Sequence, residues 1–373
     1  MRNIYIYGAN RTGTHLLLSL LSGHPDVFTA HTNTGFIRGV YGGLQDFQTA
    51  IDRDSIPELM GALWRHTKIW NLKCCDLKGH INYSHKKDEY QSLINTKPVF
   101  NSIEDKFLNK ICSAGFENIK ISNPAKLVDA FFTSWSETEH GGIAKCFVTK
   151  LDQYGPEVAS PPFVEYLSNL KPKILWMIRD PRSVAASALR RDNNIGWDEK
   201  SADRYLWQWK CLHDSLPILK KTFPVFEVSY EKLCTDTKQE MKKISDFIGI
   251  DFNESLVIPE FLGQKFEGNS SFGNLGNQVS SESLERWKEV LSTSQLRDIE
   301  RSVGKRLLEA DYEPQFKEEM KNYQPITSQA SNPGFIGSIL NSRFIQKRKN
   351  VAVLGFSFGI AVASVIAIAL FRM

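Results

Sequence analysis

Two short segments of the chain carry basic and hydroxyl side chains at a spacing that suits the binding of an anion. The first is a glycine loop, from Gly8 to Gly13, with Arg11 inside it. The second places Arg179 after an apolar run and Ser187 further along the same segment. An arginine presents paired N–H donors to a phosphate, and a glycine loop presents backbone N–H groups. These residue types therefore favour binding of a phosphorylated ligand.

The glycine loop lies between a predicted strand and a predicted helix. Residues 4–7 are β-branched and aromatic, and leucines at helical spacing run from Leu16 to a predicted helix end near Gly23. The glycines have the spacing of the P-loop motif G-x-x-x-x-G-K-[ST], but Thr14 and His15 replace its lysine and its Mg²⁺-binding hydroxyl. The loop therefore suits a donor with less charge than a nucleoside triphosphate. A glycine turn in another kind of α/β protein is the alternative for this segment alone.

The second segment has the same order of strand and then helix. Residues 173–178 are apolar enough for a buried parallel strand, Asp180 is placed to cap a helix, and Pro181 fits its first turn. Arg179 would then stand at the carboxyl end of a parallel strand, where ligands bind in such sheets. The alternative is an Asp-Pro-Arg helix start with a surface ion pair.

The first segment resembles the 5′-phosphosulfate loop of sulfotransferases that use PAPS, 3′-phosphoadenosine 5′-phosphosulfate. That loop is usually Pro-Lys/Arg-Ser-Gly-Thr-Thr, and here Asn10 replaces the proline and His15 the second threonine. In the same family an arginine and a serine with the separation of Arg179 and Ser187 hold the 3′-phosphate. The resemblance implies that the donor is held by Arg11, Thr12, Gly13, Thr14, His15, Arg179 and Ser187.

The resemblance covers about residues 1–315 and implies one catalytic domain. Its fold would be α/β, with three layers, a central parallel sheet and the likeness of a P-loop NTPase. Residues 35–140 are predicted to form a helix-rich insert, which either shapes the acceptor site, as in such folds, or is only a helical cap on the sheet. The loop at 266–274 resembles the family's C-terminal loop over PAPS, although the Arg-Lys-Gly of cytosolic members is missing. Its donor-binding candidates are Asn269, Ser270 and Ser271, and an ordinary flexible loop is the alternative for this segment.

Sulfuryl transfer to an acceptor hydroxyl or amine requires alignment and stabilisation of spread-out charge, and it needs no metal. The resemblance assigns the 5′ leaving phosphate to Arg11 and the loop amides. It assigns a second cation to Lys150, with Lys145 as the alternative. His31 is the predicted general base, because imidazole titrates near neutral pH and relatives carry a carboxylate in this region. The alternative bases are His80, Asp76 and Glu104.

Tyr230 and Glu231 match a Tyr-Glu-x-Leu step of the family, and we expect them to orient a strand end rather than to react. The net charge of +4 over 373 residues argues against general nucleic-acid binding. The six cysteines lack metal-ligand or disulfide-framework spacing, so they are interpreted as reduced thiols of a cytosolic domain.

Residues 351–371 are uncharged and almost entirely apolar, which is long enough to span a bilayer. They predict a C-terminal transmembrane anchor, joined to the catalytic domain by a linker at 316–350. Lys347, Arg348 and Lys349 precede the run, so the positive-inside rule places the catalytic domain in the cytoplasm. A G-x-x-x-G step within the run leaves a homodimer open.

The sequence thus predicts a tail-anchored sulfotransferase that uses PAPS, without a metal, on a hydroxyl-bearing carbohydrate, lipid or protein. Two alternatives from other classes stay open. One is a membrane-tethered nucleotide-binding or scaffold protein with a degenerate donor site. The other is a P-loop kinase, against which the missing Walker lysine argues.

Overall fold

The computed structural model places the chain in two compact units, residues 1–320 and residues 321–373. It describes residues 1–34, 67–70, 80–82, 124–139, 144–151, 155–191, 199–261 and 279–317, with short pieces within 102–110, 141–142 and 264–265. All of these belong to the first unit.

The centre of the first unit is a sheet of seven strands in the order β4-β3-β2-β5-β1-β6-β7. Five neighbouring strands are parallel to one another, and β3 and β4 continue the sheet in antiparallel pairing. The bounds are β1 Arg2–Tyr7, β2 Val27–Thr34, β3 Thr67–Trp70, β4 His80–Asn82, β5 Cys146–Lys150, β6 Lys173–Ile178 and β7 Val225–Ser229.

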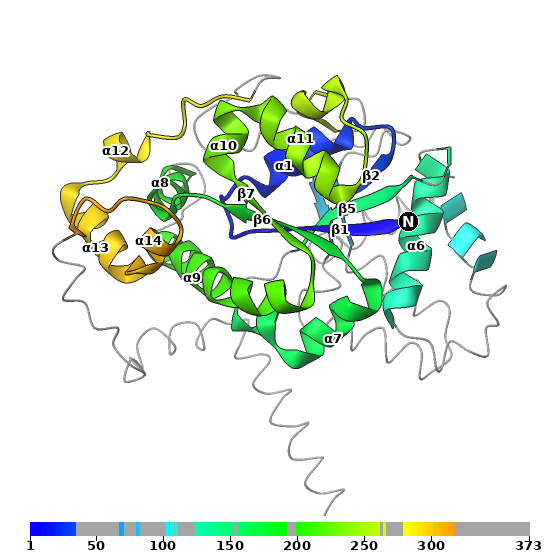
Figure 1. Cartoon of the computed structure of the whole chain (residues 1–373), viewed down its shortest axis with the longest axis horizontal. Helices are drawn as coiled ribbons and strands as arrows, with labels where there is room; N and C mark the ends of the chain where they lie inside the picture. The colour runs from blue at the N-terminus through cyan, green and yellow to red at the C-terminus, as the bar shows by residue number, and fades with distance from the viewer. Residues whose placement is uncertain are drawn as a thin grey trace, which may run out of the picture. The chain divides into compact units, whose positions relative to one another are not determined.

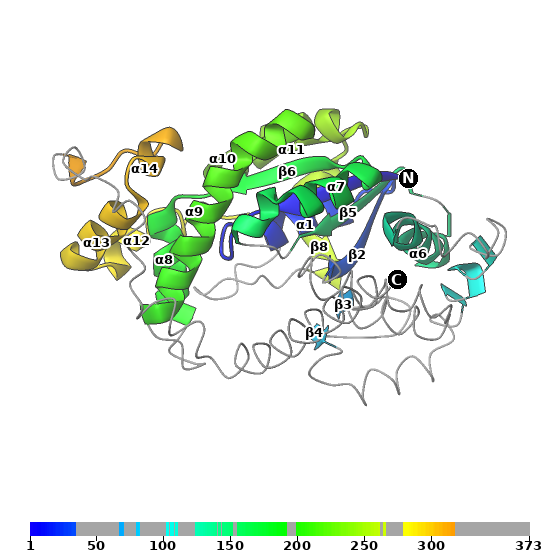
Figure 2. The same cartoon turned by 90° about the horizontal axis from the view of Figure 1, so that it is seen from below.

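Helices cover both faces of the parallel strands, which gives three layers. Figure 1 shows α1, α10 and α11 on one side of β6 and β7, and α7 and α9 on the other. Figure 2 gives the same elements from below. The helices are α1 Thr14–Ser22, α6 Pro124–Glu139, α7 Pro161–Leu170, α8 Pro181–Arg191, α9 Glu199–Thr222, α10 Tyr230–Thr235, α11 Thr237–Ile248, α12 Trp287–Val290, α13 Thr293–Val303 and α14 Arg306–Glu309. Two 3₁₀ turns, Pro156–Ala159 and Glu254–Val257, and a small ribbon of β8 Glu260–Phe261 with β9 Gln264–Lys265 complete the described elements.

The alternation of side chains along β1 divides the core into two halves. Ile4 and Ile6 belong to the cluster that α1 and α11 cover, whereas Tyr5 and Tyr7 belong to the larger cluster under α7 and α9. Successive residues of a strand point to opposite faces of its sheet, so a strand that is apolar throughout requires helices on both sides.

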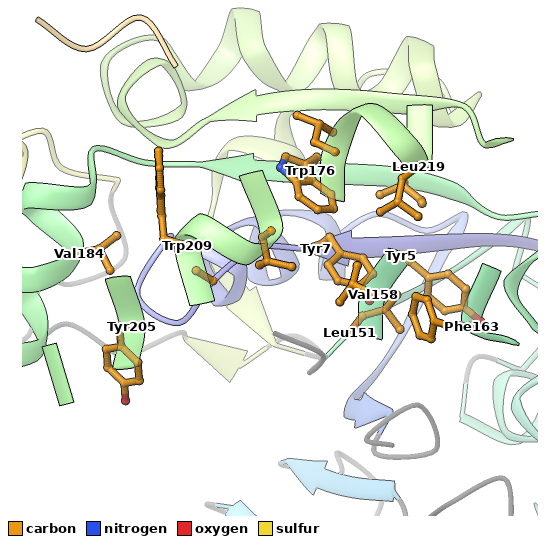
Figure 3. Packing of buried hydrophobic residues seen from close by; sticks show 14 of the residues in the cluster. Tyr5, Tyr7, Leu151, Val158, Phe163, Trp176, Val184, Tyr205, Trp209 and Leu219 are labelled. Atoms are coloured by element: carbon orange, nitrogen blue, oxygen red, sulfur yellow. The ribbon is translucent and has the colours of Figure 1, made fainter. Parts of the chain in front are cut away.

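Aromatic rings fill the larger half of the core, part of which Figure 3 shows. The ring of Tyr7 stacks on Trp176 of β6 with centroids 5.2 Å apart, and it meets the edge of Phe163 of α7 at 6.4 Å. In the same cluster, Phe132 of α6 stacks on Phe147 of β5, the other strand next to β1, with centroids 4.4 Å apart. Burial of rings of this size is a large part of what holds the helices on the sheet.

The two helices that follow β7 begin at residues with a clear capping role. Ser229 accepts a hydrogen bond from the N–H of Lys232 at the start of α10, and Asp236 does the same for Gln239 at the start of α11. Gly249 ends α11 with a φ of 80°, a conformation that suits glycine. Both caps and the terminal glycine are local signals that can be read from the sequence.

The expected α/β fold with a central parallel sheet is confirmed for the described residues. The antiparallel strands β3 and β4 are a difference, because the sequence predicts helices and loops for residues 35–140. No helix in the described part of the chain is both long and apolar enough to cross a membrane. Residues 351–371, on which the predicted anchor falls, lie outside the described residues.

Candidate functional site

The two segments predicted to bind an anion follow neighbouring strands in the parallel part of the sheet. β1 and β6 are adjacent and parallel, with Tyr7 opposite Trp176 in the register. From β1 the chain passes through α1 to β2 on one side, and from β6 it passes through α8 and α9 to β7 on the other. The carboxyl ends of two such strands form the crevice in which α/β proteins bind ligands.

The glycine loop after β1 has an unusual backbone conformation. Arg11 has a φ of 70° and Gly13 has a φ of 93°, so two of its residues are left-handed. The backbone N–H and the hydroxyl of Thr12 both donate to the carbonyl oxygen of Ala9, at 3.2 and 2.7 Å. Thr12 is buried, so these two hydrogen bonds are shielded from water and hold the shape of the loop. Helix α1 begins directly afterwards at Thr14, with its positive end toward the loop.

Two side chains predicted to bind the donor are in direct contact with this loop. The Arg11 Nε donates to the Ser187 Oγ of α8 at 2.9 Å, and the Arg179 Nη1 donates to the Arg11 carbonyl oxygen at 2.9 Å. Arg11, Arg179 and Ser187, which are far apart in sequence, thus form one cluster. His15 lies half-buried in the first turn of α1.

Arg179 is held with its charge inside the protein. It is 6% exposed, and its guanidinium carbon lies 4.0 Å above the ring centroid of Tyr230, an arrangement in which the ring face attracts the cation. Its carbonyl oxygen accepts a hydrogen bond from the indole N–H of Trp209 at 2.9 Å. Its Nε is buried and has no hydrogen-bond partner among the described residues. A buried donor without a partner costs free energy, which an anion in the crevice would relieve.

Tyr230 also fixes the glycine loop from the opposite side. A Cβ on Gly13 would lie 2.2 Å from a ring carbon of Tyr230, so only glycine fits the loop at this point. Burial raises the pKa of the Tyr230 phenol, whose oxygen is 3.3 Å from the Ser283 Oγ. Tyr230 therefore contacts both predicted donor-binding segments.

Glu231, the next residue, holds the end of β6. Its Oε1 accepts the backbone N–H of Asp180 at 3.0 Å, and its Oε2 accepts hydrogen bonds from Ser229 and Tyr312. Tyr312 has a pKa raised above its ordinary value, mainly by burial and by the Glu231 carboxylate beside it. The Tyr-Glu pair thus has the orienting geometry expected from the sequence.

The Asp-Pro-Arg helix start forms an ion pair, and the pair is buried rather than on the surface. Asp180 accepts from the backbone N–H of Arg182 at 2.8 Å and from its guanidinium at 2.8 to 3.1 Å. Arg182 also donates to Glu300 of α13 at 3.0 Å and lies 4.3 Å over the Trp287 ring. These carboxylates raise the pKa of Arg182, although burial opposes the shift. The sequence contains Asp180 and Arg182 side by side but gives no sign of Glu300, which comes from a distant helix.

The two lysines proposed as the second cation lie at opposite ends of β5. Lys150 is the last residue of the strand, 3% exposed and opposite Ile6 of β1, close to the glycine loop. Val148, two residues earlier in β5, belongs to the cluster that α1 covers. Residues two apart in a strand point to the same face, so Lys150 points to this face as well. Lys145 precedes the strand at the other edge and pairs with Asp26 at 2.8 Å. Lys145 therefore lies at the edge of the sheet opposite to the glycine loop.

The predicted base and its alternatives are described only in part. His31 lies in β2, within the register shift between Thr29 and Asn33, and His80 begins β4. Asp76, Glu104 and the closing loop with Asn269, Ser270 and Ser271 lie outside the described residues. In the described part of the chain, no group of three or more His, Cys, Asp or Glu side chains is placed to hold a metal ion.

Helix α9 supplies two contacts that the sequence does not predict. Trp209 is buried in the core and also donates its indole N–H to the Arg179 carbonyl oxygen. Gln208 accepts a hydrogen bond from the Asn10 side-chain amide at 3.0 Å. A helical periodicity shows which residues face the core, and it gives no information about which loop lies against them.

Comparison with solved structures gives several sulfotransferases. The sulfotransferase domain from the curacin biosynthetic pathway has a TM-score of 0.48 and 16% identity, and the match covers 84% of this chain and 99% of that one. The sulfotransferase domain of the Synechococcus PCC 7002 olefin synthase has a TM-score of 0.43 and 16% identity, and the match covers 81% of this chain and 94% of that one. Mouse sulfotransferase SULT7A1, complexed with PAP, has a TM-score of 0.29 and 17% identity, and the match covers 52% of this chain and 75% of that one.

No curated protein matches the chain significantly. A model of the sulfotransferase family, in contrast, matches residues 3–254. These residues include β1 with its glycine loop, β6 with Arg179, α8 with Ser187, and the turn at Tyr230. The match spans more than half of the chain, and the chain therefore belongs to the sulfotransferase family.

Proposed function

We propose that this protein transfers a sulfuryl group from PAPS to a hydroxyl or amine of an acceptor, and that the cluster at the carboxyl ends of β1 and β6 holds the donor. Membership of the family supports sulfuryl transfer in general. The observation that carries the choice of donor is the cluster of Arg11, Arg179 and Ser187, with hydrogen bonds of 2.9 Å between its members.

The cluster fits a donor that carries two separate phosphorylated groups. The glycine loop and the N-terminus of α1 form one anion-binding region. Arg179 and Ser187 form a second. The Nε of Arg179 is a buried donor without a hydrogen-bond partner in the part of the chain that the structure describes, and it suits a phosphate oxygen. A 3′-phosphate and a 5′-phosphosulfate on one nucleoside would occupy both regions. In this proposal Arg179 and Ser187 bind the 3′-phosphate, and Arg11, Thr14, His15 and the loop N–H groups bind the 5′ group.

PAPS supplies the sulfuryl group and leaves as adenosine 3′,5′-bisphosphate. The protein's part is to align the acceptor and to stabilise negative charge on the leaving phosphate. Arg11 in the glycine loop and the positive end of α1 directly after it are proposed to supply this stabilisation. Lys150 at the end of β5 is the proposed second cation. Because Lys150 is 3% exposed, its charge is poorly screened by solvent.

The acceptor side of the proposal rests on the sequence. His31 is the proposed base that takes the proton from the acceptor hydroxyl, and its strand β2 lies next to β5, which ends in Lys150. Asn269, Ser270 and Ser271 are proposed to close over the donor. The acceptor class is a hydroxyl of a carbohydrate, a lipid or a protein.

We also propose that residues 351–371 anchor the protein in a membrane with the catalytic domain in the cytoplasm. The support is the length of the apolar run and the basic residues before it. The test is fractionation of cells that express the whole chain or a form ending at residue 350, with protease protection of intact vesicles. A whole chain that stays in the aqueous fraction contradicts the anchor.

The donor is tested by calorimetric titration of the whole chain, kept in mild detergent, with adenosine 3′,5′-bisphosphate, ADP and ATP. We expect the bisphosphate to bind without Mg²⁺ and more tightly than either of the others. Arg179→Ala should weaken it at least about tenfold, because hydrogen bonds to charged groups contribute about 1.5–3 kcal/mol each.

Arg204→Ala is the matched control, because Arg204 also lies over a tyrosine ring, that of Tyr205, at 5.2 Å, but on the surface of α9. It should leave the affinity unchanged. Tighter binding of ATP would favour a P-loop kinase. Absence of any nucleotide binding would favour a scaffold with a degenerate site.

A further inference from the structure

Helix α9 holds both donor-binding segments through two consecutive side chains. Gln208 accepts from the Asn10 amide of the glycine loop at 3.0 Å, and Trp209 donates to the Arg179 carbonyl oxygen at the end of β6 at 2.9 Å. Both side chains are buried, with exposures of 7% and 5%. Figure 3 shows Trp209 beside the end of β6, between the sheet and the rest of α9. One rigid helix thus sets the distance between the two loops.

The contact with Asn10 acts at a strained point of the loop. Arg11, the next residue, has a φ of 70°, and a residue with a Cβ disfavours the left-handed region by about tenfold relative to ordinary helical geometry. Hydrogen bonds of the two neighbouring residues oppose this preference. Thr12, which follows Arg11, donates to the Ala9 carbonyl oxygen, and Asn10, which precedes Arg11, donates to Gln208. Arg11 is therefore fixed on both sides along the chain.

We propose that Gln208 is a positioning residue for the donor site, acting through Asn10 to hold Arg11 in its left-handed conformation before the donor binds. This inference rests on the proposed donor. Gln208 is not itself a donor-binding group in the proposal. It sets the fraction of molecules whose loop has the binding geometry, and the apparent affinity for the donor falls in proportion to that fraction.

The structure predicts the size of the effect. Loss of one neutral hydrogen bond to the loop corresponds to a change of about threefold to tenfold in a conformational equilibrium. We therefore expect Gln208→Met, which keeps the length of the side chain and removes the acceptor, to weaken adenosine 3′,5′-bisphosphate by about this factor. Asn10→Ala removes the same bond from the half-buried loop side and should have the same effect.

The test is a double-mutant cycle on the whole chain, with calorimetric affinity for adenosine 3′,5′-bisphosphate and urea unfolding measured for each variant. If one bond carries the effect, the double variant is no weaker than either single variant. The matched control is Lys210→Met on the same helix, which removes a hydrogen bond to Ser302 at 2.9 Å. It should lower the midpoint of unfolding and change the affinity less than twofold.

Wild-type affinity in Gln208→Met, or losses that multiply in the double variant, would overturn the positioning role. A loss of affinity in Lys210→Met as large as that in Gln208→Met would also overturn it, because the effect would then be general loosening of α9. The two proposals fail in different ways. If the wild-type chain does not bind the bisphosphate, the proposed donor is rejected, and the role of Gln208 with it.

Discussion

Removal of Glu300 should cost far more stability than removal of a surface carboxylate. Glu300 is 0% exposed, and its two oxygens accept three hydrogen bonds, from the Arg182 Nη1 at 3.0 Å and from the backbone N–H groups of Gln315 and Phe316 at 3.0 and 2.9 Å. Glu300→Ala would therefore leave a buried guanidinium with one carboxylate instead of two, and two N–H groups without their acceptor.

The magnitude follows from these contacts. Removal of one partner from a buried ion pair costs about 3–5 kcal/mol, because the other charge stays buried. Asp180 still neutralises Arg182, which reduces this cost, while each orphaned N–H group adds about 1–3 kcal/mol. We expect a loss of about 3–5 kcal/mol in the free energy of unfolding, which is a large part of the total of a typical domain. Glu300→Gln keeps an acceptor in place and should lose about half as much.

The assay is urea unfolding of the whole chain, followed by tryptophan fluorescence at neutral pH. Glu285→Ala is the matched control, because Glu285 pairs with Lys288 at the surface with 76% side-chain exposure. Glu285→Ala should lower the free energy of unfolding by less than about 1 kcal/mol. A Glu300→Ala variant that unfolds within 1 kcal/mol of Glu285→Ala would refute the reasoning, because the buried network would then contribute no more than a surface pair.

Three further predictions concern the site and its surroundings. Gly13→Ala should abolish bisphosphate binding in titration, because its Cβ would lie 2.2 Å from the Tyr230 ring at a φ of 93°; affinity within threefold of wild type would contradict this. Burial raises the pKa of Cys234 from 9.0 to about 11, so the folded state holds this proton more tightly than the unfolded state. That contribution to stability is complete below pH 9 and is lost between about pH 9 and 11, and unfolding curves of Cys234→Ala should depend less on pH in this window. Lys150→Met should lower the sulfotransferase turnover on a working acceptor by at least about tenfold, whereas Lys145→Met, at the far edge of the sheet, should not change it; equal effects would contradict the assignment.

The sequence predicts the parallel part of the fold because its signals are local. The apolar run of β1, the glycines after it and the leucines of α1 follow one another within a short stretch. The same holds for β6, Asp180 and Pro181. The carboxyl-edge rule then brings Arg11 and Arg179 together without any knowledge of the sheet order. This part of the candidate site is therefore predictable from the residues.

Contacts between distant elements could not be predicted in this way. Gln208 and Glu300 are ordinary polar residues of helices, and their partners lie far away in sequence. The antiparallel strands β3 and β4 are short, and they pair in a segment where turn and helix signals are mixed. β3 pairs with β2, which is distant in sequence, and local propensity does not contain such a tertiary pairing.

The structure distinguishes Arg179 from Arg182 by the charged partners of each guanidinium. Both are arginines, three positions apart, and both are buried with exposures of 6% and 5%. Arg182 is neutralised by Asp180 and Glu300, so its charge is used within the protein. Among the described residues, Arg179 meets only a carbonyl oxygen and the face of Tyr230, neither of which carries a formal negative charge. A buried cation without a counter-charge is costly unless an anion arrives. The uncompensated charge thus lies at the carboxyl ends of β1 and β6, and this is the physical reason for proposing a phosphorylated donor there.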